Sequence, residues 1–200
     1  MAFLYAPLYH AAMKHASTTR KSLSVKSFFN LLGPLSNPAR PSHQIIGIYN
    51  KEYLKTICET LQRLHVRRAM IVSSEDGMDE ISICDKTHIC ELMDQKIIQY
   101  TITPEEFGIK RRNPDDITGG DANTNVQITR ELLNATSKAT LNERELTRLE
   151  MVALNAGAGL YLTGKAASLK EGFNMAFQTI LTGKAKEKLV QVQSFRGGAS

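Results

Sequence analysis

The pattern of hydrophobic and polar positions predicts alternating strands and helices from about residue 44 onward. Residues 44–49 and 68–72 are short apolar runs of the length of buried strands, and residues 51–64 repeat their apolar positions with the period of an amphipathic helix. A strand, a helix and a second strand in this order imply a right-handed crossover and a parallel pair. The sequence therefore predicts an α/β fold with a mixed, partly parallel sheet flanked by helices.

The remaining pattern extends this sheet and then becomes helical. Residues 80–84, 86–92 and 96–102 are predicted strands of a small hairpin or meander. Helical segments are predicted over 9–23, 104–108, 122–135, 141–150, 155–161, 169–182 and 184–192. Asp121 is placed to cap one of them, and Ser168 with Glu171 forms a capping box for another. The glycines within 155–161 leave a smooth helix face that a neighbouring backbone can approach closely.

Residues 28–41 interrupt this regular pattern with three prolines and a glycine in an apolar segment. Such a segment is neither a continuous helix nor a central strand. We expect an ordered crossover loop over 26–42, an α/β domain over 43–195 and a disordered tail over 196–200.

Composition adds limits on the class of protein. The chain has 200 residues, 42% of them hydrophobic, and no apolar run of transmembrane length. Its three cysteines lack CxxC spacing, which favours reduced thiols and a cytoplasmic location; Cys58 is expected on a helix, and Cys84 and Cys90 on strands. The net charge is +5, but the basic residues are spread out and form no nucleic-acid module, so we expect neither a nucleic-acid nor a membrane partner.

Candidate chemistry centres on Asp79 and Glu80, which follow the predicted buried strand at 69–72. The carboxyl edge of an open α/β sheet is where ligands bind. Adjacent carboxylates repel each other, and Mg²⁺ accepts one or two carboxylates while keeping waters and substrate phosphates. The pair is therefore a candidate metal–phosphate clamp, and the alternative is a solvated acidic turn.

Three further features have alternative interpretations. Arg20 can meet a carboxylate in bidentate fashion or can be a solvated residue near a helix C-terminus. Gly119-Gly120 before a helix can bind phosphate or can be a simple junction. The run from Gly159 to Lys165 matches most of a phosphate-binding P-loop, but it lacks the final Ser or Thr and follows no strand.

Several stretches taken together resemble the anthranilate phosphoribosyltransferase family of tryptophan biosynthesis. They occur in order as Ala6-Pro7-x-Tyr9-His10, Met13-Lys14-His15, Arg20-Lys21, Phe29-Asn30-Leu31-Leu32-Gly33-Pro34-Leu35-Ser36-Asn37-Pro38, Gly77-x-Asp79-Glu80, Gly119-Gly120-Asp121-x-x-x-Asn125 and Leu154-Asn155-Ala156. The resemblance runs from residue 2 to about residue 190. It implies a fold like that of nucleoside phosphorylases and phosphoribosyltransferases, with residues 1–25 as a remnant of a helical domain.

The resemblance also implies a reaction. The amine of anthranilate attacks the anomeric carbon of phosphoribosyl pyrophosphate and displaces pyrophosphate, with Mg²⁺ on the phosphates, giving N-(5-phosphoribosyl)-anthranilate. Asp79 and Glu80 match the family's metal-binding pair. Arg20 matches the arginine that meets the anthranilate carboxylate, and Ala6, Pro7 and His10 match the lining of the channel for the aromatic acid. The resemblance gives no catalytic side chain, and it treats Asn155 and the Gly119-Gly120 junction as structural.

The departures from the family pattern bear on activity. The chain corresponds to the C-terminal part of the family's chain and lacks the Gly-Thr-Gly-Gly-Asp pyrophosphate loop and the Lys-His-Gly-Asn-Arg segment. There are two smaller departures. Ala11 stands where the family usually has Pro, and Lys21 stands where it often has Arg. We expect the isolated 200-residue chain to be nearly inactive. The alternative function is an inactive remnant or interaction module that keeps the α/β fold. The resemblance offers a homodimer as one assembly, because the family dimerises through its helical domain, most of which this sequence lacks.

Overall fold

The structure, a computed structural model, describes residues 33–195. The chain divides into two compact units, Met1–Ser42 and His43–Ser200. The helix expected over 9–23 and the tail expected over 196–200 lie outside the described residues.

The described end of the first unit is the proline-rich stretch. Residues 33–35 are helical, so the loop expected over 26–42 contains a short helical stretch. The hydroxyl of Ser36 then donates to the carbonyl of Gly33 at 3.3 Å, and the side-chain oxygen of Asn37 accepts from the amide of Ala39 at 3.0 Å. Side chains thus satisfy backbone groups where the prolines prevent a regular element.

The second unit contains a four-stranded sheet in the order β1-β2-β3-β4. Strands β1 and β2 are parallel, whereas β3 is antiparallel to both β2 and β4, so the predicted mixed sheet is confirmed. The elements are β1 His43–Gly47, η1 Lys51–Tyr53, α4 Leu54–Arg63, β2 Arg68–Ser74, β3 Thr87–Met93, β4 Lys96–Ile102, η2 Pro104–Phe107, α5 Pro114–Ile117, α6 Ala122–Asn134, η3 Lys138–Thr140, α7 Glu143–Leu162, α8 Leu169–Leu181 and α9 Lys184–Ser194.

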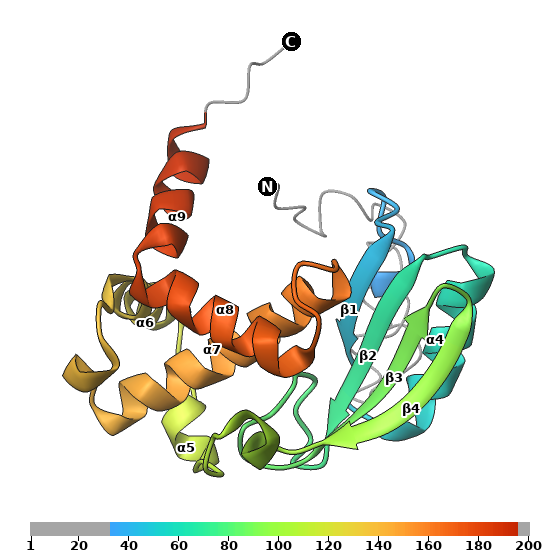
Figure 1. Ribbon diagram of the computed structural model, residues 1–200, viewed down its shortest axis with the longest axis horizontal. Helices are drawn as coiled ribbons and strands as arrows, with labels where there is room; N and C mark the ends of the chain where they lie inside the picture. The colour runs from blue at the N-terminus through green and yellow to red at the C-terminus, as the bar shows by residue number, and fades with distance from the viewer. Residues whose placement is uncertain (1–32, 196–200) are drawn as a thin grey trace. The chain divides into compact units, whose positions relative to one another are not determined.

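Helices cover both faces of this sheet (Figure 1). Alternate residues of β2 point to opposite faces, because the side-chain period of a strand is two. Met70 and Val72 join the main core with α7 and α8, whereas Ala69 and Ile71 lie on the other face, with α4. Burial on both faces explains why β2 reads as a continuous apolar run instead of an alternating one.

The strand predicted over 80–84 is wrong. Ile81 and Ile83 are buried, but they lie in the loop between β2 and β3. The amide of their neighbour Ser82 donates to the hydroxyl of Thr87 at 3.0 Å. A side chain therefore satisfies this amide, whereas in a strand the backbone of a neighbouring strand would do so. Cys84 consequently lies in this loop and not on a strand, while Cys58 and Cys90 are buried on α4 and β3 as expected.

The helices predicted over 141–150 and 155–161 are one helix, α7, because apolar residues between them continue the buried face. Helix α8 packs closely against it through two glycines. A Cβ atom on Gly157 would lie 2.4 Å from the amide nitrogen of Phe173, and one on Gly172 would lie 2.2 Å from the carbonyl oxygen of Gly157. The predicted close approach at the small-residue face is therefore confirmed.

The capping predictions for α6 and α8 are confirmed in part. The Asp121 side chain accepts from the amide of Thr124 at 2.8 Å. Ser168 accepts from the amide of Glu171 at 3.1 Å, but the Glu171 carboxylate accepts from the amide of Ala167, one residue before the expected partner. None of the helices within residues 33–195 is both long and apolar enough to cross a membrane.

A buried ion pair ties the segment after η2 to α7. The Arg112 guanidinium donates to Glu150 Oε2 through Nε at 3.0 Å and Nη2 at 2.8 Å. The two side chains are only 13% and 5% exposed. A second carboxylate, Glu143, lies 3.3 Å from Arg112 Nη1 but is 84% exposed.

We predict that Glu150→Gln lowers the free energy of unfolding by about 3 kcal/mol, because the largely buried Arg112 then keeps only the exposed Glu143 as a countercharge. Glu143→Gln is the matched control and should change it by less than about 1 kcal/mol, since its ion pair is exposed. Urea unfolding of the two variants measures both values. Equal effects would contradict a specific role for the buried pair.

Candidate functional site

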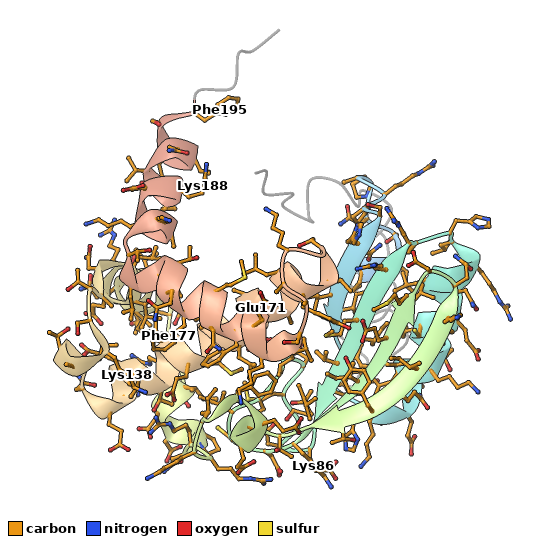
Figure 2. The ribbon with its side chains drawn as sticks, viewed as in Figure 1. Lys86, Lys138, Glu171, Phe177, Lys188 and Phe195 are labelled. Carbon is orange, nitrogen blue, oxygen red and sulfur yellow. The ribbon has the colours of Figure 1, made fainter. Side chains whose placement is uncertain are left out.

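The candidate site is the loop over residues 75–86, which leaves the carboxyl end of β2. The amide of Glu75 donates to the carbonyl of Lys86 at 3.0 Å, and the hydroxyl of Ser74 donates to the same carbonyl at 3.2 Å. Both ends of the loop are thereby fixed at one end of the sheet, where Lys86 is labelled in Figure 2. Ligands of open α/β sheets bind at this edge.

A tight turn begins the loop. The amide of Gly77 donates to the carbonyl of Ser74 at 3.1 Å, and Gly77 has a φ of 87°, a conformation that glycine adopts most readily. The Asp76 side chain accepts from the amide of Met78 at 3.1 Å and from the hydroxyl of Ser82. The turn therefore has a defined backbone path directly before Asp79 and Glu80.

Gly47, the last residue of β1, lies against the backbone of Asp79. A Cβ atom at Gly47 would lie 1.4 Å from the Asp79 carbonyl oxygen and 2.5 Å from its carbonyl carbon. These atoms belong to the main chain and cannot rotate away. Only glycine at this position allows the loop to approach β1 so closely.

Asn155 holds the other side of the loop from α7. Its side-chain oxygen accepts from the amide of Ile81 at 3.0 Å, and its side-chain nitrogen donates to the carbonyl of Ile81 at 2.9 Å. Ile81 directly follows Glu80 and is 1% exposed, so this paired contact fixes the backbone next to the acidic pair. Asn155 is thus a positioning residue of the candidate site.

The two carboxylates themselves are exposed. Partial burial and then the neighbouring negative charge of Asp79 raise the pKa of Glu80. Residues 33–195 supply neither carboxylate with a hydrogen bond or an ion pair. A divalent cation would relieve their repulsion, and two carboxylates are a sufficient protein contribution for Mg²⁺, which retains waters and binds substrate phosphates. Groups of three or more candidate metal ligands are absent from the same range.

A charged cluster supports the start of the loop. The carboxylate of Glu75 accepts from Lys51 Nζ at 3.1 and 3.0 Å, and its Oε2 lies 2.6 Å from His88 Nε2. His88 Nδ1 lies 3.2 Å from the hydroxyl of Thr101 on β4. These contacts lower the pKa of Glu75 to about 2, with His88 making the larger contribution and Lys51 the next.

The structure describes only some of the other residues that the sequence singled out as candidate binding features. Ala6, Pro7, His10 and Arg20 lie outside the described residues. The amide of Gly120 donates to the side chain of Asn125 at 2.9 Å, and the Asn125 side chain donates back to the Gly120 carbonyl, which favours the junction over a phosphate site. Gly159 belongs to α7, so the incomplete P-loop pattern has no structural basis.

Gly47, Asn155 and the contact between Glu75 and Lys51 were not predicted as parts of the site. The sequence carries a signal for Asn155, which is a polar residue within an otherwise small and apolar helix face, and such residues usually hydrogen-bond. It carries none for Gly47, because the close approach depends on tertiary structure.

Comparisons with known proteins extend over nearly the whole chain. The model of the glycosyl transferase family, a/b domain, matches residues 1–186. Anthranilate phosphoribosyltransferase of Brevibacillus brevis is 41% identical over 198 residues, covering 99% of this chain and 56% of that protein. The chain therefore spans about half the length of the curated relatives it matches.

Solved structures give the same result. The anthranilate phosphoribosyltransferase of Thermus thermophilus superposes with a TM-score of 0.81 and 36% identity, covering 95% of this chain and 54% of that chain. The Saccharomyces cerevisiae enzyme in complex with PRPP and Mg superposes with a TM-score of 0.77 and 25% identity, covering 90% and 49%. The sheet and helices described above are thus similar to those of this group of enzymes.

We predict that Gly47→Ala displaces the Asp79 backbone, because a methyl group does not fit beside the main-chain carbonyl. Mg²⁺ affinity should fall by about tenfold or more, and the free energy of unfolding by about 1–3 kcal/mol. Gly159→Ala is the matched control, since its nearest added contact is 4.0 Å away. Calorimetric titration and urea unfolding measure both effects, and an unaltered Gly47→Ala protein would contradict the steric constraint.

We predict an acid-sensitive contribution to stability from Glu75. Its pKa is depressed to about 2 in the folded chain from 4.5, so the stabilisation is fully present above pH 4.5 and is lost as the pH falls toward 2. Between pH 5 and pH 2.5, the free energy of unfolding should therefore fall less in the Glu75→Gln variant than in the wild type. Urea unfolding at the two pH values measures this difference. Glu59→Gln, which removes an exposed carboxylate 3.8 Å from Lys55, should keep the wild-type dependence.

Proposed function

This chain belongs to the glycosyl transferase family, a/b domain, and on that premise we propose that it is the C-terminal half of an anthranilate phosphoribosyltransferase. The reaction transfers the phosphoribosyl group of phosphoribosyl pyrophosphate to the amine of anthranilate in tryptophan biosynthesis. The observation that carries the proposal is the acidic loop. Asp79 and Glu80 lie exposed after the carboxyl end of β2, and Gly47 and Asn155 fix the backbone around them.

In this proposal Asp79 and Glu80 bind Mg²⁺ together with the pyrophosphate group. The metal supplies charge neutralisation for the phosphates. Breaking the bond at the anomeric carbon passes through an oxocarbenium-like state, so the protein must hold the departing pyrophosphate and position the incoming amine. The fixed loop supplies such preorganisation, because its two carboxylates need no rearrangement of the backbone.

The proposal assigns anthranilate to the N-terminal unit on the basis of the family resemblance. Arg20 would bind the carboxylate of anthranilate as a bidentate partner. Ala6, Pro7 and His10 would line the channel for the aromatic acid. These four residues are outside the described range, so their roles rest on the sequence pattern.

Activity would require the remaining half of the protein. Phosphate sites of this kind rely on backbone amides and a basic side chain, and neither the Gly-Thr-Gly-Gly-Asp loop nor the Lys-His-Gly-Asn-Arg segment occurs in this sequence. We therefore propose that these 200 residues alone are nearly inactive. We also propose a cytoplasmic location and a homodimer. An inactive remnant has less support, because the acidic pair and its positioning contacts are all present.

We predict that phosphoribosyl pyrophosphate binds in the presence of Mg²⁺, and that binding weakens at least about 100-fold in the Asp79→Asn/Glu80→Gln variant. Calorimetric titration of the complete protein containing this sequence, with and without Mg²⁺, measures this. Asp115→Asn/Asp116→Asn changes a second adjacent acidic pair, on α5, and is the matched control. Metal-independent binding, or equal loss in both variants, would overturn the proposed clamp.

The same titration of the 200-residue chain separates the two halves of the proposal. Binding by the complete protein and none by the folded 200-residue chain would support a site that needs both halves. Metal-dependent binding by the short chain would show that the acidic loop suffices without the glycine-rich loop, and would overturn the proposed dependence on the missing half.

A further inference from the structure

A cavity lies away from the acidic loop, between the β3–β4 hairpin and the start of α8. Its volume is about 480 Å³, within the range of small-molecule sites. Figure 2 labels Glu171 in the first turn of α8, which borders this region. The residues that matter for its chemistry are Glu91, Tyr100, Phe107, Tyr161, Leu169 and Lys170.

Glu91 is the unusual member of this lining. It is 1% exposed and lies on β3, facing the main core. Its Oε2 accepts from the hydroxyl of Tyr100 at 2.7 Å, whereas Oε1 has no hydrogen-bond donor among the described residues. A buried carboxylate oxygen without a donor is costly, so it indicates a group that the site is built to receive.

Glu91 makes no ion pair with a cationic side chain among the described residues. Arg68 lies near Tyr161 and lowers its pKa; its Nη2 is 3.8 Å from Asp94 Oδ2, and its buried Nε has no hydrogen-bond partner among the described residues. The two phenols remain neutral, because burial and the neighbouring carboxylate of Glu91 raise the pKa of both Tyr100 and Tyr161. The lining therefore presents a negative charge between two neutral aromatic rings.

We propose that this cavity binds a small organic cation, whose ammonium group donates to Glu91 Oε1 and whose apolar body packs against Tyr100, Tyr161 and Leu169. A carboxylate flanked by aromatic rings attracts a cation both by charge and through the ring faces. An anionic group placed beside Glu91 Oε1 would be repelled by the carboxylate. The site is independent of the proposed transferase reaction.

The ammonium group can belong to a simple amine or to an amino acid. Lys170 lies at the same cavity, and its charge favours a carboxylate. An amino acid would use Glu91 and Lys170 together, whereas a simple amine would use Glu91 alone. The affinities of ligands with the same carbon skeleton, with and without a carboxylate, distinguish an amino acid from a simple amine.

The test compares three probes of one carbon skeleton: pentylamine, 1-pentanol and norleucine. Binding is followed by chemical shifts of the Glu91 and Leu169 amides in the complete protein containing this sequence. Pentylamine should bind at least about tenfold more tightly than 1-pentanol. If norleucine binds more tightly than pentylamine, the cavity is an amino-acid site. If norleucine binds more weakly, the cavity is an amine site. Both outcomes support a site for a cation.

Glu91→Gln should weaken pentylamine binding by about tenfold or more while keeping an acceptor for the Tyr100 hydroxyl. Glu106→Gln is the control, since Glu106 also borders the cavity but already accepts from the amide of Thr103 at 2.8 Å. Leu169→Trp fills the cavity, leaves Glu91 in place and should abolish binding. This second variant keeps the test decisive if Glu91→Gln fails to fold. Equal binding of 1-pentanol, unchanged binding by Glu91→Gln, or no binding of any probe would overturn the proposal.

Discussion

The pairing of the Asn155 amide with both backbone groups of Ile81 is the interaction on which the candidate site depends. A strand would satisfy these groups from a neighbouring strand, but here a helix side chain does so, at 3.0 and 2.9 Å. The loop can therefore leave the sheet and bury Ile81 without leaving polar backbone atoms unpaired. The acidic pair then projects from a backbone that is fixed on both sides.

The close contact between α7 and α8 supports this interaction. Gly157 lies two residues after Asn155 and packs directly on the backbone of Phe173. Because main-chain atoms in contact cannot adjust as flexible side chains do, the axis of α7 has little freedom at this point. The buried Arg112–Glu150 pair fixes the same helix nearer its start. Thus two contacts far from the acidic loop determine where Asn155 can reach it.

The elements that follow from local pattern were predictable from sequence. The β1–α4–β2 unit follows from apolar periodicity, and the cap at Asp121 follows from the chemistry of its side chain. The position of Asp79 and Glu80 after the carboxyl end of β2 was predictable, because the apolar run and the two carboxylates that follow it are local in the sequence. The contacts that Gly47 and Asn155 make with the loop were not, since they join segments that lie far apart in the chain.

The predicted strand at 80–84 shows the limit of such reasoning. The alternation of Ile81, Ser82 and Ile83 is that of a strand, and both isoleucines are buried as a strand would bury them. What the pattern does not contain is the hydrogen-bond partner, which comes from Asn155 and Thr87. Similarly, nothing in the sequence around Glu91 distinguishes a buried carboxylate from an exposed strand residue.

The anchors of the acidic loop act on main-chain atoms, and this has an evolutionary consequence. Gly47 constrains the carbonyl of Asp79, and Asn155 binds the amide and carbonyl of Ile81. Neither contact depends on which side chains the loop carries at these positions. Substitutions at Asp79 and Glu80 can therefore occur without loss of either anchor. Selection for altered ligand preference can act on these two side chains, while Gly47 and Asn155, which lie outside the loop, maintain the backbone beside them.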